Sequence, residues 1–485
     1  MREVKIIDQT LRDAHQSLWA TRMTTAMMYP VLDQINQAGY EAIDLMAMAH
    51  FDSCVRYLRE DPWERVRLVS KRLDAPIGGW MRSNNLIGFD AAPDDVVELF
   101  VEKMVENGFR RITAYDGLLD NHNIVDTLIQ TKKLGVSAVA AFVYCDSPIH
   151  TDKLYVNRVT ELLKKVQVDA VMLKDAGGLL TPDRIRTLIP ALKKALGEIP
   201  LEVHSHCSTG LAPLVYLEAV KCGADAIHTG VAPLANGCAM PAIQTLSRNL
   251  RDMNYKVNIN DRFIREIEQH FKEVADREGF PEGVPMEYDA FHYKHQIPGG
   301  MLTNLIYQLE QAGIKDRYHE VLHEISIIRE ELAWPIMVTP FSQLVGTQAV
   351  LNVLHGERYK IIPDEVKKYV LGHYGKLIAP IDGNILDKIV ENGSKTIPLT
   401  REPLPNALPQ LRKQYSNATD EERLLRFMIK GSHVDEMKKA GPMNTQYHLL
   451  NDPITKIFES LTKSKDLGYV NIRSGSMKIK LGAGK

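Results

Sequence analysis

Two histidines separated by a single residue, His204 and His206, are the first chemically distinctive feature of the sequence. They end a β-rich run. Side chains two positions apart on a strand share one face, so both imidazoles can point into the same cavity. Histidine is the commonest ligand of transition metals in proteins. The pair therefore indicates a candidate metal site, and two hydrogen-bonded histidines in a barrel interior are the alternative.

Asp8 and Lys174 end two other predicted strands. In a (β/α)8 barrel the active site lies at the carboxyl ends of the strands, which would bring both residues to the histidine pair. An ammonium group has no lone pair for a metal. Lys174 could act as a neutral base or nucleophile after its pKa is lowered, or as a carbamate formed with carbon dioxide, which binds metal through oxygen. A surface lysine is the alternative.

Further polar side chains near these strand ends suit an anionic substrate. Arg82 ends the third predicted strand, and a guanidinium can hold a carboxylate through two parallel hydrogen bonds. A structural ion pair with a strand-end aspartate is the alternative for Arg82. Arg12, Asp13 and Gln16 belong to a dense polar run directly after the first strand, where loop residues often carry function.

These residues require a particular scaffold. Eight β-rich runs alternate with amphipathic helical segments in the first half, and they are Val4–Asp8, Ala42–Ala47, Ile77–Arg82, Arg111–Asp116, Ser137–Tyr144, Ala170–Asp175, Leu201–His206 and Ala226–Gly230. The helical segments between them include Thr24–Ala38, Ala92–Asn107 and Thr181–Leu196. Such alternation predicts a parallel sheet, and eight units in about 230 residues match an α/β fold of the (β/α)8 TIM-barrel type. A doubly wound open sheet is the alternative.

The pattern changes to long amphipathic helices from about residue 261, and proline recurs between Ile378 and Pro409, which predicts an extended connection. We therefore expect a catalytic barrel over residues 1–300, a mainly helical region over 301–420 and a C-terminal extension over 421–485. The lysine-rich end, Lys463–Lys485, is expected to be a solvated tail, with a small hairpin as the alternative.

Composition narrows the function classes. The 485 residues carry 59 Lys and Arg against 61 Asp and Glu, a net charge of −2, which argues against nucleic acid or a membrane surface as partner. Five cysteines without C-x-x-C spacing indicate reduced thiols. There is no apolar leader and no apolar run long enough for membrane insertion, so a cytoplasmic location is expected.

Eight motifs in order resemble the biotin-dependent carboxyltransferases, namely the carboxyltransferase domain of pyruvate carboxylase, the transcarboxylase 5S subunit and the oxaloacetate decarboxylase α subunit. They are D-Q-T-L-R-D-A-H-Q-S (Asp8–Ser17), M-R-S-N-N-L-I-G (Met81–Gly88), Y-D-G-L-L-D (Tyr115–Asp120), S-P-I-H-T (Ser147–Thr151), L-K-D-A-G-G-L-L-T-P (Leu173–Pro182), H-S-H-C-S-T-G (His204–Gly210), I-P-G-G-M-L-T-N-L (Ile297–Leu305) and S-Q-L-V-G-T-Q-A-V (Ser342–Val350).

The resemblance implies a metal, usually zinc, cobalt or manganese, held by Asp8, a carbamylated Lys174, His204 and His206. It implies that Arg82 and Gln16 bind a keto acid, with Arg12 beside them. The expected reaction moves a carboxyl group between carboxybiotin and a pyruvate- or oxaloacetate-like keto acid through an enolate, inside a barrel topped by a helical funnel, usually in a homodimer.

Several residues depart from the family pattern, namely Gln9, Trp80, Phe341 and Cys238. Cys238 stands where pyruvate carboxylase has a proton-shuttling threonine, so the resemblance gives it a proton-relay role. A thiol can relay a proton, because its pKa lies near 8.5.

The expected partners are a separate biotin carboxyl carrier protein and a biotin carboxylase or decarboxylase partner subunit. The sequence has no ATP-binding half, and only seven residues follow Lys478 in S-M-K-I, which is too few for a biotin domain. Two other functions remain open. One is a metal-dependent carbon–carbon lyase or condensing enzyme of the hydroxymethylglutaryl-CoA lyase and isopropylmalate synthase type. The other is a non-catalytic scaffold that docks a carrier.

Overall fold

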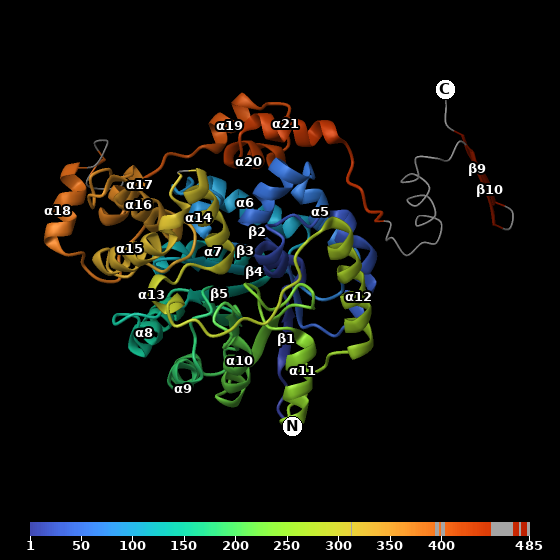
Figure 1. Ribbon diagram of the computed structural model, residues 1–485, viewed down its shortest axis with the longest axis horizontal. Coiled ribbons are helices and arrows are strands. Elements are labelled where there is room, and N and C mark those ends of the chain that lie inside the picture. The colour runs from blue at the N-terminus through green and yellow to red at the C-terminus, as the bar shows by residue number, and fades with distance from the viewer. Residues whose placement is uncertain (312, 393–396, 399–402, 448–468, 475–476, 483–485) are drawn as a thin grey trace.

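The first half of the chain forms a closed barrel of eight parallel strands (Figure 1). The computed structural model describes residues 1–447 except 312, 393–396 and 399–402, together with 469–474 and 477–482. The strands are β1 (Lys5–Asp8), β2 (Ala42–Ala47), β3 (Ile77–Met81), β4 (Arg111–Asp116), β5 (Ser137–Val143), β6 (Ala170–Asp175), β7 (Leu201–Ser205) and β8 (Ala226–Thr229). Strand β8 pairs with β1 and closes the barrel. The predicted TIM barrel is therefore confirmed, and the open sheet is excluded.

Helices surround the barrel because the connections between consecutive parallel strands contain them, and two more, Ile243–Asp252 and Asp261–Glu278, follow β8. They are α1 (His15–Leu18), α2 (Thr25–Met28), α3 (Leu32–Gln37), α4 (Met48–Ser53), α5 (Pro62–Ser70), α6 (Asp94–Asn107), α7 (Val125–Lys133), α8 (Asp152–Leu163), α9 (Pro182–Leu196), α10 (Ala212–Lys221), α11 (Ile243–Asp252) and α12 (Asp261–Glu278). The segment predicted as one helix over Thr24–Ala38 is divided by a 3-10 turn, Tyr29–Val31, which contains Pro30. Proline cannot donate the backbone hydrogen bond that a continuous helix needs.

Helix α9 shows how the sequence specifies these elements. Thr181 accepts a hydrogen bond from the Arg184 amide, and Pro182 follows in the first turn. Ile185, Ile189 and Leu192 recur at three- and four-residue spacing and are all buried, so one face of the helix lies against the barrel. Each such side chain contributes about 1.5–3 kcal/mol when fully buried.

A second apolar core organises the helical region beyond the barrel. This region contains α13 (His292–His295), α14 (Gly299–Gln311), α15 (Tyr318–Glu331), α16 (Phe341–His355), α17 (Asp364–Val370) and α18 (Gly383–Asn392). Phe341 joins it to the barrel, because a Cβ atom on Gly117 of the loop after β4 would lie 2.6 Å from the Phe341 ring. The bulky residue at position 341 thus fits a glycine on the barrel.

The chain after the helical region differs from the expected extended connection. Helix α18 lies within Ile378–Pro409, and α19 (Leu408–Gln414), α20 (Asp420–Met428) and α21 (Gly431–Ala440) follow. These last three helices return to the barrel, where Glu421 contacts Arg67 of α5 at 3.0 Å and Asn107 of α6 at 2.7 Å. The extended connection predicted from the recurrent prolines is therefore wrong at Gly383–Asn392, where apolar side chains form a helix.

The predicted tail Lys463–Lys485 lies partly outside the described residues, and its described part, 469–474 and 477–482, is a pair of strands, as the alternative prediction of a small hairpin implies. Strands β9 (Tyr469–Ser474) and β10 (Met477–Gly482) pair antiparallel, and Lys478 lies on β10. Over the described part of the chain, no helix has the length and apolar character needed to cross a membrane.

Candidate active site

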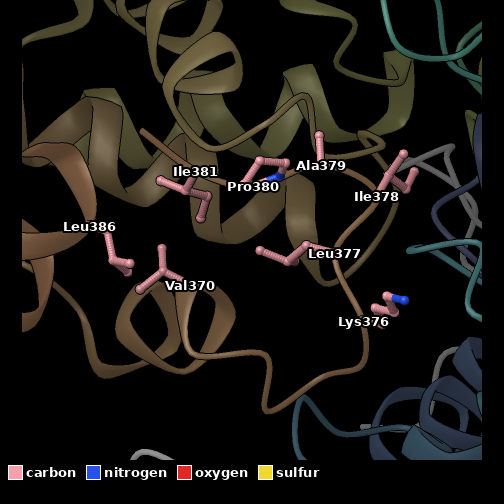
Figure 2. Close-up of a pocket in the computed structure, with 8 residues that line it drawn as sticks. All are labelled: Val370, Lys376, Leu377, Ile378, Ala379, Pro380, Ile381 and Leu386. Carbon is pink, nitrogen blue, oxygen red and sulfur yellow. The ribbon is translucent and has the colours of Figure 1, made fainter. Parts of the chain in front are cut away.

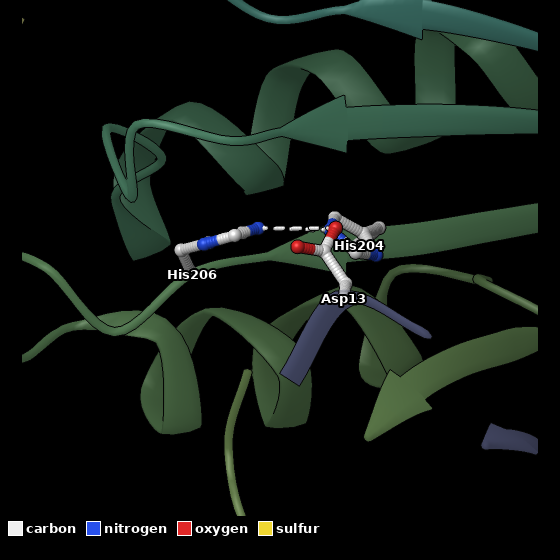
Figure 3. Close-up of side chains that lie close together, drawn as sticks. All are labelled: Asp13, His204 and His206. Carbon is white, nitrogen blue, oxygen red and sulfur yellow. Dashed lines mark hydrogen bonds and ion pairs between the residues drawn. The ribbon is translucent and has the colours of Figure 1, made fainter. Parts of the chain in front are cut away.

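Three side chains meet at the carboxyl end of the barrel, Asp13, His204 and His206 (Figure 3). The Nε2 atoms of the two histidines lie 3.1 Å apart. Asp13 Oδ2 lies 3.2 Å from His204 Nε2 and 3.5 Å from His206 Nε2. All three residues are buried. The spacing of the two histidines therefore brings both imidazoles together on one face, as the sequence indicated.

The aspartate in this group is Asp13, whereas the resemblance assigned Asp8. The Asp8 carboxylate is engaged by Thr10, whose hydroxyl donates to it at 2.6 Å and whose amide donates at 3.2 Å. Burial raises the pKa of Asp8 to about 7. Directly after β1 the chain makes a wide π-helical turn, Thr10–Ala14, which carries Asp13 to the histidines. The polar run after the strand was the signal that pointed to Asp13.

The donor set fits a divalent metal. Tetrahedral zinc with bonds of about 2.0–2.1 Å holds its ligand atoms about 3.3 Å apart, close to the distances among these three atoms. Burial would raise the pKa of Asp13, but Arg12 and the two histidines outweigh it and hold that pKa well below its usual range. Asp13 is thus an anion ready to bind a cation.

The surroundings of His206 fix its ring. Its Nδ1 lies 2.6 Å from the carbonyl oxygen of Cys238, so Nδ1 carries the hydrogen and Nε2 is left with its lone pair. The Cys238 thiol donates to the carbonyl of Ser17 at 3.1 Å, and burial raises its pKa. Cys238 therefore contacts His206 through its backbone carbonyl, and its thiol is directed to Ser17.

Lys174 lies on β6 with a side chain that is only 5% exposed. Its Nζ is 3.9 Å from the ring centre of Tyr115 and 5.0 Å from that of Trp80. Burial and the nearby positive charge of Arg12 lower the pKa of Lys174 to about 7. A large fraction of the amine is therefore neutral near neutral pH, which both chemical roles predicted for Lys174 require.

Arg82 and Gln16 both have unused hydrogen-bonding capacity. Arg82 Nη2 donates to the carbonyls of Leu86 and Ile87 at 3.0 and 2.6 Å, while its buried Nη1 has no partner. Gln16 Oε1 is also buried without a partner. No carboxylate pairs with Arg82 among the described residues, so the structural ion pair considered from the sequence is not formed.

Arg12 and Trp80 complete the site, and the sequence had marked Trp80 only as a departure from the family pattern. The Arg12 guanidinium forms an ion pair with Asp13 and lies 4.0 Å from the ring centre of Trp80. The Trp80 indole in turn lies 5.3 Å from the His204 ring, between ring centres. The position of Trp80 near the carboxyl end of a predicted barrel strand was the signal that could have placed it in the site.

A separate groove in the helical region has a different character. It encloses about 430 Å³ between α17 and α18, and Figure 2 shows aliphatic side chains along most of it. Among the described residues that line it, only Lys376 can titrate. The groove therefore lacks the groups for the chemistry that the Asp13 cluster can support.

Comparisons with known proteins agree with this architecture. A family model described as a conserved carboxylase domain matches residues 293–470, and one described as HMGL-like matches residues 119–270. The carboxylase match falls mainly on the region beyond the barrel, which favours a carboxyltransferase over a lyase.

Several characterised proteins are similar over most of the chain. A pyruvate carboxylase subunit of Methanocaldococcus jannaschii is 40% identical over 419 residues, covering 86% of this chain and 73% of that protein. The methylmalonyl-CoA carboxyltransferase 5S subunit of Propionibacterium freudenreichii is 34% identical, covering 87% and 85%. The carboxyl transferase domain of Rhizobium etli pyruvate carboxylase, solved with pyruvate and biocytin, superposes with a TM-score of 0.82 at 25% identity, covering 91% and 78%. The chain belongs to the carboxyltransferase family of the biotin-dependent carboxylases, and it is an enzyme.

Proposed function

We propose that this enzyme transfers a carboxyl group between biotin, carried on a separate protein, and a small keto acid of the pyruvate and oxaloacetate type. The observation that carries the proposal is the buried group of Asp13, His204 and His206 with Lys174 and Arg82 around it. The relatives that act as a pyruvate carboxylase and a 2-oxoglutarate carboxylase, by their names, support an acid of the 2-oxo class.

A divalent metal, zinc, cobalt or manganese, would be held by Asp13, His204 and His206, with Lys174 as the fourth ligand in carbamylated form. When bound, it would stabilise negative charge on the oxygen of an enolate. Carbamylation requires a neutral amine, which the lowered pKa of Lys174 supplies. Without the carbamate, the metal would have three ligands from the protein, namely one carboxylate and two neutral imidazoles.

The chain's own residues would bind and orient the keto acid. The free Nη1 of Arg82 would donate to the substrate carboxylate, and the backbone carbonyls of Leu86 and Ile87 hold that guanidinium in place. Gln16, whose buried amide oxygen has no partner, would donate from its NH2 group to an oxygen of the keto acid. The burial of these groups keeps water from competing and strengthens each charge-assisted contact.

We further propose that the enzyme is a homodimer in the reducing environment of the cytoplasm. We also propose two kinds of partner: a biotin carboxyl carrier protein, and a biotin carboxylase or decarboxylase subunit. All five cysteines are free thiols, which suits a reducing compartment. Two of the relatives are themselves subunits by name, one of a pyruvate carboxylase and one of a methylmalonyl-CoA carboxyltransferase, which supports an assembly with further chains.

The test is decarboxylation of oxaloacetate by the purified chain, with and without free biotin in place of the carrier. Lys174→Ala should abolish turnover and lower bound metal, because it removes the carbamate ligand. Lys164→Ala, an exposed lysine at the end of α8, is the matched control and should behave as the wild type. Full activity in Lys174→Ala would exclude the carbamate. Absence of activity with pyruvate, oxaloacetate and 2-oxoglutarate in the metal-loaded wild type would exclude this substrate class.

A further inference from the structure

The indole of Trp80 lies at the centre of the site and contacts three of its functional groups. Trp80 is on β3 and is 0% exposed. Its ring centre is 4.0 Å from the Arg12 guanidinium carbon and 5.0 Å from Lys174 Nζ. The same ring lies 5.3 Å from the His204 ring at an interplanar angle of 56°. One side chain therefore lies beside Arg12, Lys174 and one imidazole of the proposed active site.

A hydrogen bond to Asp44 of β2 fixes the orientation of the Trp80 ring. Trp80 Nε1 donates to Asp44 Oδ2 at 2.8 Å, and the amide of Gln9 donates to the same oxygen. Gln9 Nε2 also lies 2.8 Å from His228 Nδ1. An indole has a single N–H donor. Rotation of the ring would leave the N–H without a partner and weaken the hydrogen bonding of a fully buried carboxylate, which is costly.

The bonded side chains that support Trp80 extend toward the end of the barrel where its strands begin. His228 Nε2 lies 3.0 Å from Glu202 Oε2, and Glu202 forms an ion pair with Arg111 at the start of β4. Five buried polar side chains thus form a continuous chain beneath Trp80, and its members come from four strands and from Gln9, next to β1. Because each of these side chains is bonded to the next, together they restrict movement of the Trp80 ring.

The Trp80 ring affects the proposed active site through its contact with Arg12. The Arg12 guanidinium forms an ion pair with Asp13, while its Nε is buried without a hydrogen-bond partner. Two contacts therefore hold the guanidinium, the carboxylate of Asp13 and the face of Trp80. A cation over an indole face is attracted strongly when both are removed from water. If the ring were absent, Arg12 could swing toward the vacated space and draw the Asp13 carboxylate away from the histidines.

We propose that Trp80 is a positioning residue for the metal-binding group: anchored by Asp44, its ring holds Arg12 and, through Arg12, sets the Asp13 carboxylate against His204 and His206. This inference rests on the proposed function, in which these three residues bind a divalent metal. Trp80 and Gln9 both depart from the family pattern, and the structure joins the two through one oxygen of Asp44.

The test compares variants of two buried tryptophans. Trp63 on α5 is also fully buried, packs against Phe51 and Phe100, and has an indole N–H without a partner. Trp63→Leu therefore removes comparable packing outside the polar chain beneath Trp80. The dissociation constant for Zn²⁺ is measured by competition with a chromophoric chelator for wild type, Trp63→Leu, Trp80→Leu and Trp80→Phe.

We expect Trp80→Leu to bind Zn²⁺ about 10- to 100-fold more weakly, as loss of a supporting partner does at other metal sites. Trp80→Phe keeps a ring for Arg12 but loses the bond to Asp44, so its loss should be intermediate. Trp63→Leu should bind as the wild type, although its unfolding midpoint in urea falls. A folded Trp80→Leu protein that binds Zn²⁺ as tightly as Trp63→Leu would overturn the inference, and should that variant not fold, wild-type affinity in Trp80→Phe would overturn it.

A wild type that binds no Zn²⁺, Co²⁺ or Mn²⁺ would instead contradict the proposed function. The contact between Trp80 and Arg12 is then tested by urea unfolding of Trp80→Leu, Arg12→Met and the double variant, because the leucine variant removes the ring that Arg12 contacts. A double variant that loses less stability than the sum of the single losses supports the coupling of Trp80 to Arg12. Losses that add fully would overturn it.

Discussion

The choice between Asp8 and Asp13 as the metal-binding aspartate can be tested by a pair of identical substitutions. Asp13→Asn removes the anion that faces both His204 and His206 at 3.2 and 3.5 Å. Asp8→Asn makes the same chemical change five residues earlier, where the carboxyl group accepts hydrogen bonds from Thr10. If the geometry is right, only the first substitution should affect metal binding.

The two substitutions should also differ in their cost to folding. Asp13 is the ion-pair partner of the buried Arg12, and removal of one member of such a pair costs about 3–5 kcal/mol. The pKa of Asp8 is raised to about 7, so its carboxyl group is partly neutral at neutral pH. An amide oxygen can accept the Thr10 hydroxyl in its place, and we expect a loss on the order of 1 kcal/mol for Asp8→Asn.

The assay is metal content per chain after dialysis against trace Zn²⁺, together with urea unfolding of each protein. Asp13→Asn should lose most of its metal, with an affinity reduced more than about 100-fold, because a direct ligand matters more than its supporting partners. Asp8→Asn should retain the wild-type content. The opposite result, metal lost from Asp8→Asn and kept by Asp13→Asn, would refute the assignment and restore the one drawn from the sequence.

Three further changes test other parts of the structure. Arg82→Ala should raise KM for the keto acid about 10- to 100-fold in steady-state kinetics, since a charge-assisted contact contributes about 1.5–3 kcal/mol, while metal content stays constant; loss of metal from this variant would show that Arg82 is structural. Phe341→Ala should lower unfolding stability by about 3–5 kcal/mol, because it opens a cavity against Gly117; an unchanged urea midpoint would contradict the proposed contact between barrel and helical region. Glu202→Gln tests pH dependence. Burial opposes ionisation of Glu202, but Arg111 and His228 outweigh it and hold the pKa of Glu202 below its usual 4.5, so its stabilising effect is present above that pH and is lost as the pH falls through the folded-state pKa. The stability gap between wild type and Glu202→Gln should therefore narrow on acidification in urea titrations, and a gap that widens would reverse the sign of the argument.

The barrel strands could be predicted closely because the residue pattern that specifies each strand lies within a short segment of the sequence. Buried strands such as Ala42–Ala47 and Ala170–Asp175 are mainly apolar, with charged residues only at Asp44 and at Lys174 and Asp175, and the predicted bounds of both match the structure. The period of two likewise brought His204 and His206 onto one face. Helix ends marked by Thr181 and Pro182 follow the same local rules.

Features that depend on contacts between distant segments could not be obtained in this way. The prolines between Ile378 and Pro409 suggested an extended chain, but apolar residues there form α18 within the core of the helical region. Helices α19 to α21 pack on the barrel through pairs such as Arg67 and Glu421, which lie 354 residues apart. Local propensity carries no information about such pairings.

The sequence alone determined which residue types gather at the carboxyl end of the barrel, because strand alternation and motif order place Asp8, Asp13, Lys174 and the two histidines there. Only the tertiary structure decided which aspartate faces the histidines. The π-helical turn Thr10–Ala14 contains Asp13, and its wide path turns Asp13 toward the histidines while Thr10 engages Asp8. The tertiary structure also decided the role of Trp80, since Asp44, Gln9 and Arg12 meet its indole only when the barrel closes.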